Sequence, residues 1–343
     1  MTTAEQRVTE AIEARRERVN EAIPEDLPIK RPERLYEASR YLLDAGGKRP
    51  RPTMLFLAAD SFADVEPLST PYREFPDAQG DPVDVMAAGV SVEIIHLFTL
   101  IHDDIMDDDD LRRGVPALHR EYDTEMAILA GDTLYSSAFE IMLETGAPAE
   151  RSVRALDMLA STCTEICEGQ AFDIDFESRA DVTAGEYDEM IELKTAVLYG
   201  ASASIPAILL GADDETVEEL YRYGIDVGRA FQIQDDLLDL MASSDDMGKQ
   251  RGSDLIEGKR TLITTHAREQ GVDVDALVDP ENPTDDDINA AVEALREAGS
   301  IEFARERAHE LIAQGKGRLE VLPDNEARGL LADVADYLVE REY

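Results

Sequence analysis

Two aspartate clusters, each at the end of an apolar helical run, constrain this chain more than any other feature of its sequence. Asp103-Asp104-Ile105-Met106-Asp107 follows the apolar run 90–101, and Asp235-Asp236-Leu237-Leu238-Asp239 follows the shorter run 230–234. They are the only two DDxxD patterns in the chain. Residues four apart lie on one face of an α-helix, so the first and last aspartates of each cluster share a face. Two such faces turned towards each other would hold hard divalent cations, which prefer carboxylate oxygens and commonly share substrate phosphates.

The composition offers a competing explanation, because the whole chain is acidic. It has 75 acidic and 33 basic residues and a formal net charge of −42. Charge of this size keeps a protein soluble while opposing compaction, as in halophiles, and it predicts solvated surface at most clusters, such as 213–215 and 285–287. Charge that ends an apolar helix is different, because it must be paired or bound to metal. We therefore interpret the two DDxxD clusters as metal ligands and the remaining acidity as adaptation to a salt-rich cytoplasm.

The spacing of apolar residues predicts an all-α helical bundle. Apolar side chains recur three and four positions apart in the ranges 35–43, 54–63, 85–105, 127–143, 153–174, 187–199, 217–240, 262–267, 288–295 and 330–339. The N-terminal segment is interpreted as a charged helix, and Pro206 is expected to kink or break the helix around it. We find no linker, so the prediction is a single all-α domain over 1–343, with a surface loop over 64–84.

Several classes of protein are disfavoured by composition. The N-terminus lacks the apolar core of a signal peptide, and we find no apolar run near the ~18–20 residues of a membrane span, so we expect a soluble cytoplasmic protein. The strong negative charge argues against nucleic acid and anionic membranes as partners. Cys163 and Cys167 are expected to be reduced core residues.

Basic residues are few, and several of them stand at places suited to an anionic ligand. Gly46-Gly47-Lys48-Arg49-Pro50-Arg51 groups three cations around a glycine pair, which allows close backbone approach. Arg112-Arg113 directly follows the first aspartate cluster. Lys194-Thr195 lies within a predicted helix, Lys249 follows the second cluster, and Lys259-Arg260 precedes another helix. Because an acidic protein repels diphosphates at long range, local cations together with metal would have to bind them.

The order of these motifs resembles the trans-isoprenyl (polyprenyl) diphosphate synthase family, in particular archaeal-type geranylgeranyl diphosphate synthases of halophiles. The resemblance rests on GGKRPRP, HLFTLIHDDIMDDDDLRRG, KT, FQIQDDLLD, GK and GKRT, over residues 46 to 261. It implies the isoprenoid-synthase helical bundle around a central cavity and a homodimer. It also implies condensation of isopentenyl diphosphate with allylic diphosphates (dimethylallyl, geranyl or farnesyl) through ionisation, condensation and elimination.

The resemblance also implies roles for individual residues. Two or three Mg²⁺ ions would be held by Asp103, Asp104, Asp107, Asp235, Asp236 and Asp239. The allylic diphosphate would be bound by Arg112, Lys194, Thr195, Gln232, Lys249 and Lys259. Isopentenyl diphosphate would be bound by Lys48, Arg51, His96 and Arg113, whereas His102 is expected to be an ordinary core histidine.

The length of the product is expected to depend on Phe98 and Thr99, one helical turn before the first aspartates. An aromatic ring there, with an uninterrupted DDxxD, resembles the enzymes that make chiefly geranylgeranyl diphosphate. Farnesyl diphosphate, alone or as a second product, is the alternative. A terpene cyclase would call for a different second metal motif, and a non-catalytic synthase subunit commonly lacks the aspartates. A Ca²⁺-binding module would need an EF-hand loop, which we do not find.

Overall fold

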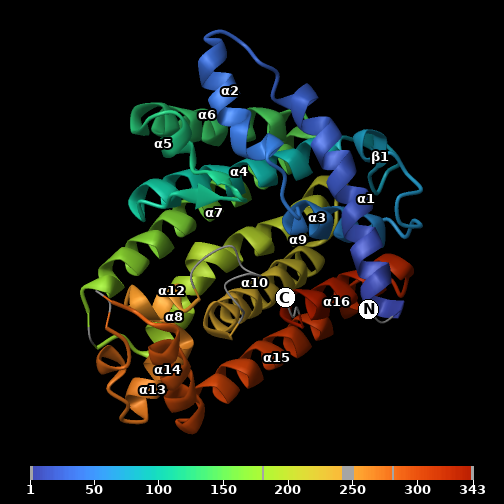
Figure 1. The fold of residues 1–343 in the computed structure, drawn as a ribbon. Helices are drawn as coiled ribbons and strands as arrows, with labels where there is room; N and C mark the ends of the chain where they lie inside the picture. Colours follow the sequence, from blue (N-terminus) through green and yellow to red (C-terminus); the bar gives the residue numbers. More distant parts are fainter. Residues whose placement is uncertain (1–2, 180, 242–250, 280–281, 341–343) are drawn as a thin grey trace. The chain divides into compact units, whose positions relative to one another are not determined.

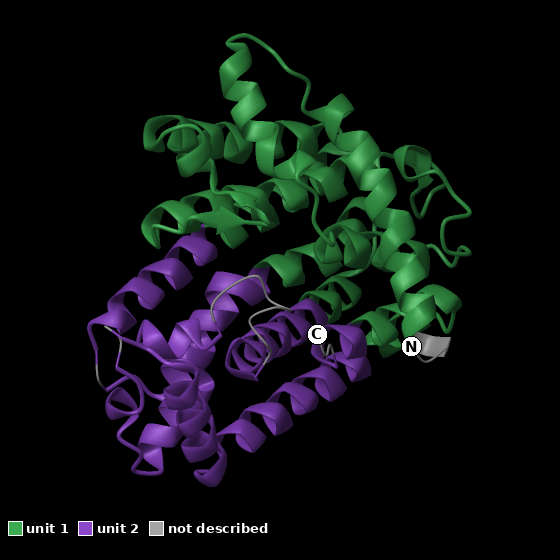
Figure 2. Ribbon diagram, in the orientation of Figure 1, with its two compact units in different colours: residues 1–163, 198–221, 319–334 green, residues 164–197, 222–318, 335–343 purple. Residues whose placement is uncertain are grey.

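The computed structural model describes residues 3–179, 181–241, 251–279 and 282–340, and almost all of their regular structure is α-helical (Figure 1). This confirms the predicted fold class. The chain forms two compact units (Figure 2), unit 1 with residues 1–163, 198–221 and 319–334, and unit 2 with residues 164–197, 222–318 and 335–343. Among the described residues, four helices begin in one unit and end in the other, so this part of the chain has no simple linker at which it could be cut. They are Ala149–Glu177, Val197–Leu210, Asp214–Met241 and Glu326–Val339. The predicted single domain over 1–343 stays a prediction.

Unit 1 is organised around α4 (Val85–Met106), the helix that carries the first aspartate cluster. Helix α4 packs against α6 (Thr124–Leu143), α3 (Pro50–Phe62) and α1 (Thr3–Asp26), while α2 (Glu33–Asp44) packs against α6 (Figure 1). Because α4 is apolar on nearly every side, it is stable only when covered on several sides. Gly89 makes one of these contacts possible, since a Cβ there would lie 2.5 Å from the Phe56 ring.

Two short hairpins accompany the helices of unit 1. The segment that we expected to be a surface loop contains a 3₁₀ turn, η1 (Tyr72–Glu74), and the antiparallel pair β1 (Phe75–Pro76) and β2 (Pro82–Val83). Its side chains Tyr72, Phe75 and Val83 are buried, so the segment also contributes to the core. The second hairpin, β3 (Leu111–Arg112) and β4 (Val115–Pro116), follows the first aspartate cluster. Helix α5 (Leu118–Glu121) comes after it.

The other helices follow in chain order. They are α7 (Ala149–Glu177), α8 (Ala184–Ile191), a π-helix (Glu192–Ala196), α9 (Val197–Leu210), α10 (Asp214–Met241), α12 (Ser253–Ile256), α13 (Leu262–Glu269), η3 (Val274–Ala276), α14 (Asp285–Glu297), α15 (Ser300–Arg318), η4 (Leu319–Val321) and α16 (Glu326–Val339). In unit 2, α13 packs against α15, α14 and α8. Thr261 caps α13 by accepting a hydrogen bond from Thr264 N, which fixes where that helix begins.

Four details differ from the sequence-based expectations. Helix α15 was not predicted, because charged side chains interrupt its apolar residues at short intervals. Helix α9 continues through Pro206 instead of breaking there. Cys167 is exposed, and only Cys163 is buried. Two helical segments, 85–106 and 184–210, are long and apolar enough to cross a membrane. Because 72% and 83% of their apolar windows are buried inside the structure, we interpret them as core helices.

Candidate active site

The first aspartate cluster closes α4 and is tied to the hairpin that follows it. Asp104 is buried, and its Oδ1 accepts a hydrogen bond from Arg112 Nε at 2.6 Å. Arg112 also forms an ion pair with Asp109 at 3.0 Å. Burial raises the pKa of Asp104, an effect that Arg112 opposes. Asp103 is half-buried and Asp107 is exposed, one turn apart, so these two are better placed than Asp104 to meet a ligand from solvent.

The turn of the β3–β4 hairpin places Arg113 against the glycine pair. Arg113 and Gly114 have φ values of 54° and 77°, so both central residues are left-handed, as in the type I′ turn of tight hairpins. The Arg113 guanidinium donates to the carbonyl oxygens of Leu42 (3.0 Å) and Gly46. A Cβ on Gly47 would lie 2.9 Å from Arg113 Cζ, so glycine is needed there for this approach.

The basic loop, residues 46–49 between α2 and α3, and the first turn of α3 together carry three cations with different surroundings. Arg49, which we had assigned no role, is fully buried and donates to Glu93 Oε1 (2.5 Å), to the Leu43 carbonyl (2.8 Å) and to Asn20 Oδ1 (3.1 Å). Arg51 is buried with its guanidinium 4.3 Å from the centre of the Tyr199 ring, a cation–π contact. Lys48 is exposed.

His96 lies on α4 within the field of this cationic group. Burial lowers the pKa of His96 well below its ordinary value, and the charges of Arg51, Arg113, Arg49 and Arg112 lower it further. The imidazole is therefore neutral near pH 7. The structure thus brings Arg51, His96 and Arg113 into one concentrated positive region of unit 1. The remaining histidine of this helix, His102, is half-buried and meets Gly131, where a Cβ would lie 2.8 Å from its Nε2.

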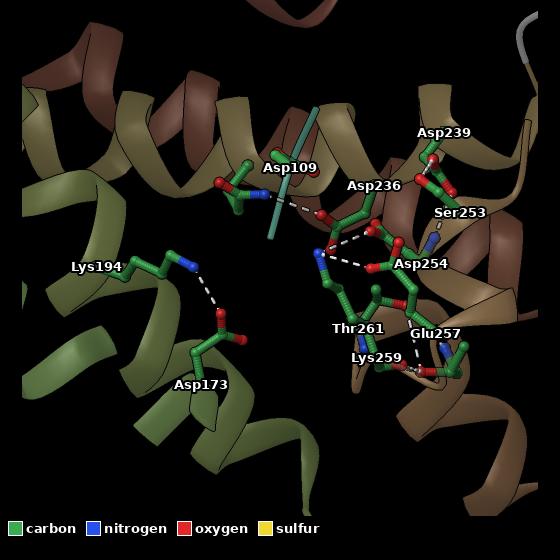
Figure 3. A network of polar contacts seen from close by, with 12 residues as sticks. Asp109, Asp173, Lys194, Asp236, Asp239, Ser253, Asp254, Glu257, Lys259 and Thr261 are labelled. Atoms are coloured by element: carbon green, nitrogen blue, oxygen red, sulfur yellow. Dashed lines mark hydrogen bonds and ion pairs between the residues drawn. The ribbon is translucent and has the colours of Figure 1, made fainter. Parts of the chain in front are cut away.

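In unit 2, two aspartates of the second cluster, Asp236 and Asp239, are held by hydrogen bonds on both carboxylate oxygens. Figure 3 shows these two side chains with Ser253 and Asp254 beside them. Asp236 accepts from the Tyr187 hydroxyl (2.5 Å) and from Gln232 Nε2 (3.0 Å). Asp239 accepts from Ser253 Oγ (2.7 Å) and from the backbone N–H of Asp254 (3.1 Å). The first aspartate of the cluster, Asp235, is exposed.

These carboxylates form a group whose negative charges oppose one another. Burial, with Asp254 nearby, raises the pKa of Asp236 well above its usual range. Burial and the charge of Asp239 raise the pKa of Asp254 to about 7. The Lys259 ammonium lies 3.6 Å from Asp254 and 3.2 Å from Glu257, so it offsets part of this charge. A region with such surplus negative charge is suited to cations.

The π-helix Glu192–Ala196 positions Lys194 and Thr195. Short π-helical turns are frequent at functional sites, and this one lies against Gly169, where a Cβ would be 2.2 Å from Lys194 N. Lys194 Nζ donates to Asp173 at 2.6 Å (Figure 3), and Thr195 donates to Gln232 Oε1 at 3.0 Å. A hydrogen-bonded chain therefore runs from Thr195 through Gln232 to Asp236. Lys249 lies outside the described residues.

The predicted metal ligands fit Mg²⁺ by their chemistry. Among the described residues, no three Asp, Glu, His or Cys side chains are grouped as a ready-made metal centre. Mg²⁺ is usually held by one or two carboxylates together with substrate phosphates and water, so a complete protein cage is not needed. One buried oxygen, Asp104 Oδ2, accepts no hydrogen bond from any residue that the structure describes. The donor set, all carboxylate oxygen, suits a hard cation.

Of the two predicted chain-length residues, Phe98 lies on the face of α4 that meets α6. The Phe98 ring centre lies 4.9 Å from that of His102 and 5.1 Å from that of Tyr135, which in turn lies 5.1 Å from that of Phe139. Thr99 is half-buried and donates to the carbonyl of His96 (2.7 Å). Phe98 therefore begins a row of aromatic rings between α4 and α6.

Sequence reasoning missed several residues that support these sites. They are Arg49, Glu93, Asp173, Tyr187, Ser253 and Asp254. Glu93 carried a signal that could have been used, since it is the one charged residue within the apolar run 90–101. Arg49 stands in the basic motif 46–51, where it had been given no role of its own, and the remaining residues stand in ordinary polar surroundings of the sequence.

An all-α bundle with carboxylate clusters and a separate cationic group defines the class of isoprenoid synthases, and comparisons with known proteins support this. The polyprenyl synthetase family matches residues 32–295. The chain is 71% identical, over the full length of both, to a geranylfarnesyl diphosphate synthase of Natronomonas pharaonis. It is 48% identical to a geranylgeranyl diphosphate synthase of Methanosarcina mazei, over 98% of each chain.

Solved structures agree with the sequence relatives. A geranylgeranyl pyrophosphate synthetase from Geoglobus acetivorans is similar with a TM-score of 0.86 and 43% identity, over 96% of this chain and 99% of the other. A geranylgeranyl pyrophosphate synthase from Corynebacterium glutamicum, complexed with isoprenyl diphosphate and magnesium, has a TM-score of 0.80 and 28% identity, over 98% and 99%. The chain belongs to the polyprenyl synthetase family, and it is a trans-isoprenyl diphosphate synthase.

Proposed function

We propose that this protein condenses isopentenyl diphosphate with allylic diphosphates to give chiefly geranylgeranyl diphosphate. The observation that carries the proposal is that the site residues form two groups, which would bind a diphosphate in different ways: one group directly through cations, the other through metal held by carboxylates. In unit 1, Lys48, Arg51 and Arg113 supply cations around a neutral histidine. The aspartate clusters supply carboxylates instead. The allylic substrate must lose its diphosphate and needs metal, whereas isopentenyl diphosphate has only to be bound.

The metal is proposed to be Mg²⁺, which the magnesium-bound relative supports. We further propose two or three ions for each active site. When bound, the metal supplies electrostatic stabilisation to the departing diphosphate. Asp103, Asp107 and Asp235 are our proposed direct ligands, because they are the more accessible members of their clusters. Asp236 and Asp239 are proposed to orient the second cluster, since protein donors already occupy both oxygens of each. Asp104 is proposed to orient Arg112.

The protein's own residues would act on the two substrates in turn. Lys194 and Lys259 exchange their present carboxylate partners for the allylic diphosphate, together with Arg112. As the carbon–oxygen bond breaks, these cations stabilise the charge that develops on the leaving group. The side chains of Thr195 and Gln232, already fixed by hydrogen bonds, present oxygen atoms that can stabilise the allylic cation.

The second substrate is proposed to be held by Lys48, Arg51, Arg113 and His96. Its double bond attacks the allylic cation, forming the new carbon–carbon bond, and a proton is then lost to the released diphosphate. No protein base is needed for this step. Neutral His96 can donate a hydrogen bond to the held diphosphate without adding charge, because its pKa is low. Exclusion of water by the apolar residues of α4 prevents hydrolysis of the cation.

Product length has a second candidate, geranylfarnesyl diphosphate. The relative at 71% identity bears that name, and its similarity covers both whole chains. Two other relatives are named for geranylgeranyl diphosphate, whereas one from Aeropyrum pernix is again named for geranylfarnesyl diphosphate. Farnesyl diphosphate is retained as an intermediate or second product. We propose that the half-buried ring of Phe98, which packs against Tyr135 of α6, limits the product to twenty carbons.

We also propose that the active form is a cytoplasmic homodimer. Helix α6 carries four exposed apolar side chains, Ile128, Leu129, Tyr135 and Leu143, which a second copy would cover. Sedimentation in molar KCl tests the dimer.

Incubating purified protein with labelled isopentenyl diphosphate and an allylic primer tests the activity. We expect elongation in the presence of Mg²⁺ and none after chelation with EDTA. A cyclic hydrocarbon product, or no product with any primer, would contradict the proposal. Chromatography of the dephosphorylated products distinguishes fifteen-, twenty- and twenty-five-carbon chains.

A further inference from the structure

A buried carboxylate on α4, Glu93, joins two arginines of the cationic region in unit 1. Its Oε1 accepts from Arg49 at 2.5 Å and from Arg113 at 3.3 Å, and its side chain is 1% exposed. The other oxygen, Oε2, is buried and accepts no hydrogen bond from the described part of the chain. Glu93 does not face solvent, and its hydrogen bonds and ion pairs within the described residues go to Arg49 and Arg113.

Arg49 and Arg113, the two hydrogen-bond partners of Glu93, both have left-handed backbone conformations that surrounding contacts must maintain. Arg49 and Arg113 have φ values of 53° and 54°, in the left-handed region that non-glycine residues rarely adopt. Such residues persist when surrounding contacts fix them, and they gather at functional sites. Arg49 holds the basic loop through the Leu43 carbonyl, and Arg113 holds it through the Gly46 carbonyl. Glu93 therefore connects α4, the basic loop and the β3–β4 turn at one atom.

The charge of Glu93 also keeps the cations together. Arg49 and Arg113 are close enough for their charges to oppose each other, and burial lowers the pKa of Arg113. In a low-dielectric interior, two arginines beside one another need a shared anion. With Glu93 in place, their positions are set before substrate arrives. Arg51 makes no hydrogen bond to Glu93 among the described residues, and its guanidinium lies over the Tyr199 ring instead.

We propose that Glu93 is a positioning residue for the isopentenyl diphosphate site, holding Arg113 and the loop 46–49 in the geometry that binds the diphosphate. The inference rests on the proposed function of Lys48, Arg51, His96 and Arg113. It predicts an effect on one substrate only, because the carboxylate clusters and Lys194 make no contact with Glu93 among the hydrogen bonds and ion pairs of the described residues.

The test compares Glu93→Gln with Asp60→Asn, a matched control in the same unit. Asp60 is also fully buried, accepts from Arg15 (2.7 Å) and Tyr72 (2.9 Å), and lies on α3 away from the basic loop. Both variants should lose thermal stability, because each leaves a buried arginine without its anion. Only Glu93→Gln should raise the KM for isopentenyl diphosphate, by about tenfold, the usual effect of losing one charged hydrogen bond. The KM for the allylic substrate should change less than about twofold, within the usual effect of a site with no shared contact.

A double variant keeps the inference testable if Glu93→Gln does not fold. Arg49→Met with Glu93→Leu removes the buried pair together, which is often nearly neutral for stability, while Arg113 still loses its acceptor. It should fold and show the same selective rise in KM. An equal rise in both KM values, or an unchanged KM for isopentenyl diphosphate in both Glu93 variants, would overturn the inference.

The variant Lys48→Ala distinguishes an error in the role of Glu93 from an error in the proposed isopentenyl diphosphate site. If Lys48→Ala raises the KM for isopentenyl diphosphate while the Glu93 variants do not, the site is correct and the role of Glu93 is wrong. If none of these variants changes that KM, the proposed isopentenyl site itself fails.

Discussion

Replacing Phe98 by alanine should lengthen the product by one five-carbon unit. Phe98 lies five positions before Asp103, so at ~1.5 Å rise per residue it is about 7.5 Å further along α4. The next turn, at Ile94 and Ile95, lies about 5.4 Å deeper. An extended five-carbon unit with carbon–carbon bonds of about 1.5 Å spans roughly 5 Å. Removing one ring therefore makes room for about one unit.

The free energy of burying a longer product also favours extension by one five-carbon unit. Burying five carbons gains up to about 4 kcal/mol at roughly 0.8 kcal/mol for each, which is ample to favour further extension once the steric block is gone. The loss of the Phe98 ring contacts with His102 and Tyr135 lowers stability. A fully buried Phe→Ala change costs about 3–5 kcal/mol, and because Phe98 is half-buried we expect about half of that. Turnover should fall only modestly, since Phe98 touches no proposed metal ligand among the ring contacts of the described residues.

The assay is product analysis with saturating isopentenyl diphosphate, comparing the parent, Phe98→Ala, Phe139→Ala and the double variant. Phe139 is the matched control, because it continues the same aromatic row but meets Tyr135 instead of Phe98. Phe139→Ala alone should leave the product unchanged. An identical product distribution in Phe98→Ala and the parent would refute the reasoning and move the limit to Ile94, Ile95 or a neighbouring subunit.

Three further predictions concern the metal, the salt and the pH. Asp103→Ala or Asp235→Ala should lower kcat about a hundredfold or more, because each variant loses a metal ligand. The circular dichroism spectrum of each variant should remain helical. Parental turnover in either variant would contradict the hypothesis that both clusters bind metal. Thermal stability and activity should rise from low to molar KCl, because salt screens the repulsion within a chain whose net charge is −42. The Debye length falls from about 10 Å at 0.1 M to about 3 Å at 1 M. A Tm independent of KCl would show that the acidity serves another purpose. Because the pKa of His96 is lowered in the folded state, the unfolded chain binds the extra proton below about pH 6.5, and stability falls as pH decreases, by at most about 1.4 kcal/mol per pH unit. His96→Gln should reduce this loss between pH 6.5 and 5, and an equal acid dependence of Tm in parent and variant would rule the effect out.

Helix positions could be predicted wherever apolar residues recur at helical spacing, and the exceptions have physical causes. Helix α15 escaped because Arg, Glu and His residues separate its buried positions, such as Ile301, Ala304 and Leu311. Pro206 does not end α9, because the buried surroundings of that helix outweigh one missing hydrogen bond. Local sequence preference is a weak guide when tertiary contacts decide.

The aspartate clusters themselves could be found from sequence, but the different tasks within each cluster could not. All three aspartates of the second cluster have the same chemical identity, yet Asp236 and Asp239 are held by Tyr187, Gln232, Ser253 and the backbone of Asp254. Hydrogen-bond partners from other elements are brought together only by folding. Nothing in the spacing of the motif distinguishes Asp235 from its neighbours.

The sequence alone determined the helical class, the family and the residue types of the site, because periodicity and motif order are local properties of the chain. Tertiary structure decided the burial and the partner of each basic residue. Arg49 and Arg51 stand two residues apart in one motif, yet Arg49 is paired with Glu93 and Arg51 lies over Tyr199. The physical reason is that a charge takes its role from its partners and its burial, and both come from residues distant in sequence.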